Sequence, residues 1–168
     1  MIEQYDLSYL NLKSIQNFLY STQTNEHGLI TKGKSSFNFG MPILMYSELQ
    51  SLNKIIKKYV RIYCEKHKIT KLKFINSWFN ITEPGSKLKP HNHSGGEESI
   101  LSGAFYVSVG ENSVPLLFPD IDTSIKPYSG LLVIFSSDLV HYTEEEKEQR
   151  IVISFNTDYE ESTRYTGH

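Results

Sequence analysis

Apolar residues at helical spacing dominate the first seventy residues of the chain. Asn11 is typical of a helix N-cap, and apolar residues then recur every three or four positions as far as Leu19. A second helix is predicted after Ser47, which stands three residues before Gln50 in the spacing of a capping box. Between the helices, residues 28–42 are rich in Gly, Ser, Lys and Asn and predict an irregular or extended connection. The apolar faces consist of Leu12, Ile15, Phe18 and Leu19 in the first helix, and of Leu49, Leu52, Ile56, Tyr59 and Tyr63 in the second.

After Lys71 the pattern changes to short apolar runs bounded by turn residues. No helical pattern lies between these runs, which disfavours a parallel sheet with crossover helices. The economical architecture is mainly β, an antiparallel sandwich or barrel with the two helices packed outside. We predict a single domain over residues 1–168, with 1–70 as a helical N-terminal support, 71–160 as the β core and 161–168 as a tail. The predicted strands span residues 72–81, 101–109, 114–118, 131–135 and 151–155.

Alternation along two of these strands separates an apolar face from a polar one. In the second predicted strand, Ser102, Ala104 and Tyr106 share the face opposite the large apolar residues. In the last strand, Arg150 and Ser154 share a face, again opposite the apolar residues. Each polar face is either exposed to solvent or the wall of a polar cavity, in which Tyr106 would be a hydroxyl donor.

Composition and charge narrow the classes of partner and compartment. The chain has 17 Lys and Arg against 19 Asp and Glu, so no global basic field indicates a nucleic acid or an anionic membrane as partner. Cys64 is the only cysteine, which excludes an internal disulfide framework. The first residues lack the pattern of a signal peptide, and no apolar run approaches membrane-spanning length. We therefore expect a cytoplasmic protein, and the oligomeric state stays open, a homodimer included.

The residues that point to chemistry are histidines. His91 and His93 are two positions apart, so in an extended segment both imidazoles face the same side and can bind one cation, although such pairs also arise by chance on surfaces. His141 follows the strand over residues 131–135, and Arg150 lies nine residues further on. We predict that the acidic residues in between cross a solvated hairpin, which would bring Arg150 near His141. A guanidinium there would bind a carboxylate whose other end chelates the metal.

Four segments together resemble the iron(II)- and 2-oxoglutarate-dependent oxygenases. Within that superfamily they are most similar to small, poorly characterised bacterial and phage proteins that carry His-x-His. The resemblance covers roughly Trp78 to Asn156. The segments are His91-x-His93, Ser102-Gly-Ala-Phe-Tyr106, Gly130-Leu-Leu-Val-Ile-Phe-Ser-Ser with His141, and Arg150-Ile-Val-Ile-Ser-Phe-Asn156.

The resemblance implies a double-stranded β-helix, or jelly roll, over residues 71–160, with Fe(II) held at one mouth. His91, His93 and His141 would be the catalytic metal ligands. Arg150 and Tyr106 would hold the cosubstrate 2-oxoglutarate, and Asn80 and Ser154 are looser candidates for the same pocket. The implied activity is that of a dioxygenase that couples decarboxylation of 2-oxoglutarate to succinate with O2-dependent oxidation of a C–H bond. The substrate would be a peptide or a small metabolite, and residues 28–42 and 119–128 would form the rims of the pocket.

His93 departs from the family pattern, because most of the superfamily has Asp or Glu there. Three neutral imidazoles leave the full charge of Fe(II), which favours a dianionic cosubstrate. Alternatively, His93 points away and Glu97 or Glu98 is a substitute carboxylate. A second resemblance, to cupins, would place His91, His93, Glu97 and His141 on one metal and give Arg150 no role. A metal-binding jelly roll without catalysis also stays open, as does an exposed Arg150 that pairs with the acidic run.

Overall fold

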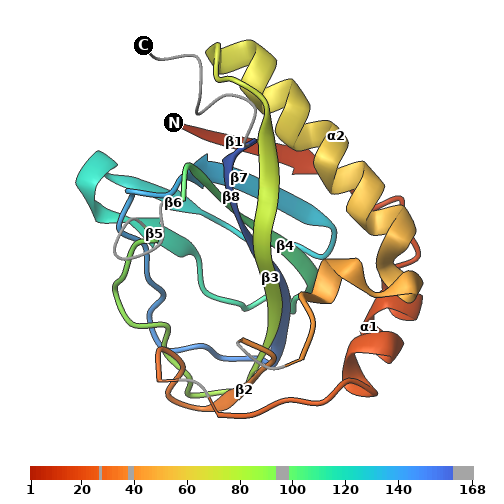
Figure 1. Cartoon of the computed structure of the whole chain (residues 1–168). Helices are drawn as coiled ribbons and strands as arrows, with labels where there is room; N and C mark the ends of the chain where they lie inside the picture. Colours follow the sequence, from red (N-terminus) through yellow and green to blue (C-terminus); the bar gives the residue numbers. More distant parts are fainter. Residues whose placement is uncertain (27, 38–39, 94–98, 161–168) are drawn as a thin grey trace.

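The computed structural model describes residues 1–26, 28–37, 40–93 and 99–160, and strands make up most of its framework (Figure 1). The strands are β1 (Ile2–Asp6), β2 (Gly33–Ser35), β3 (Leu72–Thr82), β4 (Leu101–Ser108), β5 (Leu116–Phe118), β6 (Thr123–Ile125), β7 (Leu131–Ser136) and β8 (Arg150–Tyr159). A six-stranded sheet has the order β1-β7-β4-β8-β3-β2, and β5 and β6 form a two-stranded sheet. Neighbouring strands are antiparallel in both sheets, as the sequence predicted.

The two predicted helices are present. Helix α1 spans Leu12–Tyr20, and the side chain of Asn11 caps it by accepting the N–H of Ser14 at 3.2 Å. Helix α2 spans Gln50–His67 and ends at Lys68, whose φ of 55° terminates the helical path. The predicted capping box is wrong. The chain enters α2 through a 3₁₀ turn, Ser47–Leu49, and the Ser47 hydroxyl bonds the Glu48 carboxylate at 3.1 Å instead of a helical N–H. A further 3₁₀ turn, Ile43–Met45, precedes it, and another, Pro119–Ile121, follows β5.

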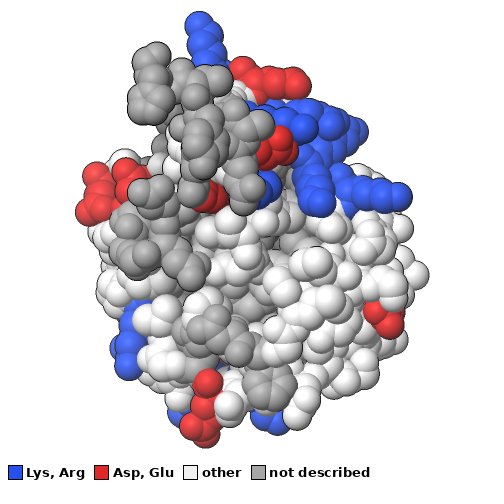
Figure 2. Space-filling view, viewed as in Figure 1, with Lys and Arg blue, Asp and Glu red and all other residues white. Residues whose placement is uncertain are grey.

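The large sheet packs differently on its two faces. On one face, α1 and α2 cover an apolar cluster that includes Leu19, Ile56, Phe105 and Ile153. On the other face, β5 and β6 cover a smaller apolar cluster. Figure 1 shows the helices and the small sheet on opposite sides of the large sheet. On the face that Figure 2 shows, the largest group of Lys and Arg side chains lies over α2. No helix in the described ranges is long and apolar enough to cross a membrane.

Two expectations about organisation need correction. The predicted helical support over residues 1–70 also supplies two strands of the large sheet, since β1 pairs with β7 and β2 pairs with β3. The predicted hairpin that places β8 beside β7 is wrong, because β4 lies between them. Strands β7 and β8, which are consecutive in the sequence, are therefore separated in space by β4, as in a jelly roll. The other predicted strands are confirmed, with ends that differ by up to four residues.

Candidate metal centre and adjoining cavity

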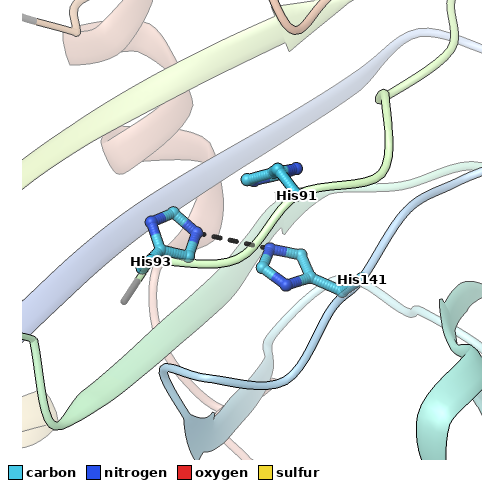
Figure 3. Close-up of side chains that lie close together, drawn as sticks. All are labelled: His91, His93 and His141. Carbon is cyan, nitrogen blue, oxygen red and sulfur yellow. Dashed lines mark hydrogen bonds between the residues drawn. The ribbon is translucent and has the colours of Figure 1, made fainter. Parts of the chain in front are cut away.

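His91, His93 and His141 come together at one end of the sheet, where two loop segments pair (Figure 3). The backbone N–H of His91 donates to the carbonyl of His141 at 3.2 Å, and the N–H of His141 donates back to His91 at 2.9 Å. The N–H of His93 bonds the carbonyl of Ser137 at 2.9 Å. One ring nitrogen from each histidine lies within 4.8 Å of the others, so backbone pairing places all three imidazoles where one cation would contact them.

Hydrogen bonds fix the tautomer of two of the rings. Nδ1 of His91 lies 2.7 Å from the carbonyl oxygen of Lys89, and Nδ1 of His141 lies 3.1 Å from that of Leu139. A carbonyl only accepts, so each Nδ1 carries a proton and each Nε2 of the neutral ring keeps a free lone pair. Metal-ligating histidines typically bind the metal through one ring nitrogen and donate the N–H of the other to a carbonyl, as Nδ1 does here.

Burial keeps the three rings neutral. It lowers the pKa of His141 to about 3 and that of His93 to about 4, and the nearby histidines lower both further. The pKa of His91 is lowered for the same reason, against the opposing effect of its bond to Lys89. Neutral imidazole is the form that binds a metal, so at neutral pH no proton has to leave before a cation enters.

The stability of the metal-free protein is expected to fall as the pH drops below 6.5, the ordinary pKa of histidine, toward about 4. The folded-state pKa values of His93 and His141 lie below the unfolded values, so the unfolded chain binds more protons throughout this window. At about pH 5 the loss is on the order of 2–4 kcal/mol for the two rings together. Urea unfolding at about pH 7 and about pH 5 with a chelator present would measure it. An equal loss in a His93→Gln/His141→Gln variant would contradict this assignment.

The third ring, His93, belongs to a chain of side-chain hydrogen bonds. Its Nδ1 lies 3.4 Å from Nδ2 of Asn156, whose Oδ1 accepts the Ser102 hydroxyl at 2.7 Å. Ser102 contacts the hydroxyl of Ser137 at 2.9 Å, and Ser137 contacts that of Ser99 at 2.7 Å. For Nε2 of His93 to bind a metal, Nδ1 must carry the proton, which requires the Asn156 amide to turn its oxygen toward the ring. The hydroxyls allow this because each of them donates or accepts.

The three histidines open into a cavity of about 350 Å³ between β3, β4 and β8. This volume is at the lower end of the range for small-ligand pockets. The polar faces predicted for β4 and β8 line it, so they are cavity wall rather than solvent-exposed surface. The cavity also contains Trp78, the only tryptophan, whose ring centroid lies 5.9 Å from that of His93. All four predicted cosubstrate residues line it as well, namely Asn80, Tyr106, Arg150 and Ser154.

Arg150 is buried, with 5 % of its surface exposed, so the alternative of an exposed strand residue is wrong. Its Nη1 donates to the carbonyl of Val114 at 3.2 Å and forms an ion pair with Oε2 of Glu146 at 3.0 Å. Its Nε is buried and has no hydrogen-bond partner among the described residues, and the same holds for Oδ1 of Asn80. Such groups are costly to leave unpaired, and both residues line the cavity.

Tyr106, the hydroxyl donor that the alternation along β4 predicts, lies in the wall of this cavity. The side chain is 2 % exposed, and the Arg150 guanidinium carbon lies 5.8 Å from the centroid of its ring. Burial raises the pKa of Tyr106, against the opposing effect of Arg150, so the hydroxyl stays protonated and able to donate.

Sequence reasoning missed two residues next to the site and named two that the structure does not describe. Asn156 and Glu146 were given no role, although Asn156 shares the polar face of β8 and this alternation would have placed it. Glu97 and Glu98, the alternative carboxylate ligands, lie outside the described residues. Of the two expected rims, residues 28–42 contribute Leu29, Ile30 and Phe37 to the lining, whereas residues 119–128 contribute none.

Comparisons with known proteins place the fold. No protein-family model and no curated protein matches the sequence. A Pseudomonas putida prolyl-4-hydroxylase aligns with a TM-score of 0.69 and 15 % identity over 95 % of this chain and 92 % of that one. The collagen prolyl hydroxylase of Paramecium bursaria Chlorella virus-1, in complex with 2-oxoglutarate, gives 0.66 and 20 % identity over 93 % and 94 %. The fold is that of these oxygenases.

A third similar structure is HygX from Streptomyces hygroscopicus with nickel, 2-oxoglutarate and hygromycin B bound. It aligns with a TM-score of 0.66 and 10 % identity over 93 % of this chain and 82 % of that one. The predicted jelly roll with two helices packed outside is confirmed. At these identities the comparisons establish the architecture, and the chemistry must be argued from the site.

Proposed function

We propose that this protein is an Fe(II)- and 2-oxoglutarate-dependent dioxygenase that hydroxylates its substrate and forms succinate. One observation carries the proposal. The same cavity contains three neutral imidazoles together with a buried guanidinium whose Nε has no partner in the described part of the chain. A metal and a dicarboxylate would satisfy the two sets of groups at the same time.

The three imidazole nitrogens at one end of the cavity are suitable ligands for Fe(II). His91, His93 and His141 would hold the ion, and the bonds of His91 and His141 to backbone carbonyls keep the correct nitrogens free. Bound there, the iron would supply the oxidising chemistry by activating O2 at the expense of 2-oxoglutarate. The protein orients the cosubstrate and excludes water, since Phe118 and Phe135 pack against the His141 ring at centroid distances of 5.9 and 4.9 Å.

The other end fits the distal carboxylate of 2-oxoglutarate. Arg150 would bind it through the guanidinium, and the Tyr106 hydroxyl would donate a second hydrogen bond. Asn80 and Ser154 line the same wall and would complete the contacts through the amide and hydroxyl groups. With its distal carboxylate held by Arg150, the cosubstrate would point its 2-oxo acid end toward the three histidines.

The proposed substrate is a peptide or a small metabolite. Among the similar structures, one prolyl hydroxylase from Trichoplax adhaerens is in complex with a peptide fragment of hypoxia inducible factor, and HygX holds hygromycin B. These ligands support both classes. We also propose a cytoplasmic location, which the single cysteine supports because Cys64 is free and buried.

Anaerobic titration with Fe(II) and 2-oxoglutarate tests the function. We expect the weak visible charge-transfer band of the chelate, and succinate when O2 is admitted. Iron binding without that band and without succinate would favour the non-catalytic jelly roll. A protein that binds no metal would contradict both functions.

Asn156→Ala is expected to weaken metal binding by about 10- to 100-fold, the range typical of residues that orient a ligand. The reason is the contact between Asn156 and Nδ1 of His93. Asn156→Asp is the matched variant, because a carboxylate accepts the Nδ1 proton without turning and should keep or increase the affinity. Quenching of Trp78 fluorescence by Ni(II) would measure both. Equal affinities for Asn156→Ala and wild type would mean that this contact does not orient the ligand.

A further inference from the structure

Glu146 is a buried carboxylate that the proposed chemistry has not yet used. It is 2 % exposed although it ends the run Glu144-Glu145-Glu146, whose acidic pattern predicts a solvated hairpin. Its Oε2 contacts Nη1 of Arg150 at 3.0 Å and accepts the Ser113 hydroxyl at 2.8 Å. Its Oε1 accepts the N–H of Val114 at 3.2 Å and that of Lys147 at 3.0 Å. Both oxygens are therefore satisfied, which is the requirement for burying a carboxylate.

The position of this charge relative to the cavity is unusual. No Asp or Glu among the described residues lines the cavity itself, and the metal ligands carry no charge. Glu146 contacts Arg150 at Nη1, while Nε has no partner within the described ranges. The guanidinium can thus bind Glu146 through one edge and a ligand carboxylate through another.

A comparison of formal charges shows what Glu146 changes. A facial triad contains two neutral histidines and one carboxylate. The formal charges of that carboxylate, Fe(II), one arginine and the 2-oxoglutarate dianion then add up to zero. With His93 in place of the carboxylate, the same set has an excess of one positive charge. The buried charge of Glu146 returns the sum to zero, at the opposite end of the cosubstrate.

We infer that Glu146 is a positioning residue for Arg150 and supplies, behind the guanidinium, the negative charge that the metal end lacks because of His93. This inference rests on the proposed function. Its consequence is that the charge at position 93 and the charge at position 146 substitute for each other in setting the affinity for 2-oxoglutarate. A residue that only held the loop in place would not have this property.

The test measures ligand affinity in the Ni(II)-loaded protein by Trp78 fluorescence, with no turnover required. Glu146→Gln keeps the shape of the side chain and removes the charge, so 2-oxoglutarate should bind about fivefold more tightly. Pyruvate, a 2-oxo acid without the distal carboxylate, should change less than about twofold. His93→Asp should weaken 2-oxoglutarate binding about fivefold, and the double variant should return to within about twofold of wild type.

Ser113→Ala is the matched control for a purely structural role, because it removes a hydrogen bond to Glu146 and no charge. It should lower the thermal stability and leave the affinity for 2-oxoglutarate unchanged. The inference is overturned if Glu146→Gln weakens 2-oxoglutarate binding, if pyruvate responds equally, or if Glu146→Gln does not offset His93→Asp. If Glu146→Gln does not fold, the test rests on His93→Asp. Unchanged or tighter binding of 2-oxoglutarate by that variant would overturn the inference. A wild-type protein that binds no 2-oxoglutarate would overturn the proposed function as well.

Discussion

Replacing His141 by alanine is expected to abolish iron binding and, with it, the formation of succinate. His141 is the most buried of the three candidate ligands, and its backbone bridge to His91 places both rings at the same end of the sheet. Nε2 of His141 lies 3.3 Å from Nε2 of His93. Loss of the His141 ring therefore leaves only two imidazoles to bind the metal. The affinity for Fe(II) should fall by more than about 100-fold, because a ligand contributes more than the residues that orient it. Anaerobic competition with a chromophoric chelator would measure the loss.

The control for this substitution is His67→Ala. His67 is the last residue of α2 and does not line the cavity, and its Nε2 contacts Glu3 at 2.9 Å. That variant should keep the wild-type affinity for iron. His141→Ala also leaves a void beside Phe118 and Phe135, so its folding must be verified by circular dichroism and by the cooperativity of unfolding. A folded His141→Ala protein that still binds iron with wild-type affinity would remove His141 from the metal site.

The parts of the site that depend on local pattern were predictable from the sequence. His91-x-His93 needs only an extended segment to face one side, and Arg150 and Ser154 follow from alternation along one strand. The helices were predictable for the same reason, since spacing within a short window determines which face is apolar. Asn11 behaves as a cap because the cap bond joins residues three apart.

The features that sequence reasoning missed are non-local. The order β7-β4-β8 depends on pairing between strands far apart in the sequence, and no pattern within β7 or β8 reveals that β4 separates them. Strand β1 is short, and its partner β7 lies more than a hundred residues away. Glu146 looks like its exposed neighbours Glu144 and Glu145, and only the contacts to Arg150 and Ser113 distinguish it. A buried charge is recognised by its partners, and those partners are set by the tertiary structure.

Arg150→Met is expected to weaken 2-oxoglutarate binding by about 100-fold, the effect of truncating one member of a buried charge pair. Methionine keeps an unbranched side chain in the wall of the cavity but provides no donor for the distal carboxylate. Metal binding should stay unchanged, because Arg150 contacts none of the three histidines through any hydrogen bond or ion pair found among the described residues. Titration of the Ni(II)-loaded protein with 2-oxoglutarate and with pyruvate would separate the two effects, since only the dicarboxylate should lose affinity.

Arg150→Met also leaves Glu146 buried beside an apolar side chain, which would destabilise the fold and obscure the result. The double variant Arg150→Met/Glu146→Gln avoids this, because it removes both charges of the pair and retains an amide for the hydrogen bonds to Ser113 and Val114. It should be more stable than Arg150→Met alone and equally unable to bind 2-oxoglutarate. If the double variant instead binds 2-oxoglutarate as wild type does, the guanidinium is needed only to neutralise Glu146, and the distal carboxylate is held by other groups of the cavity.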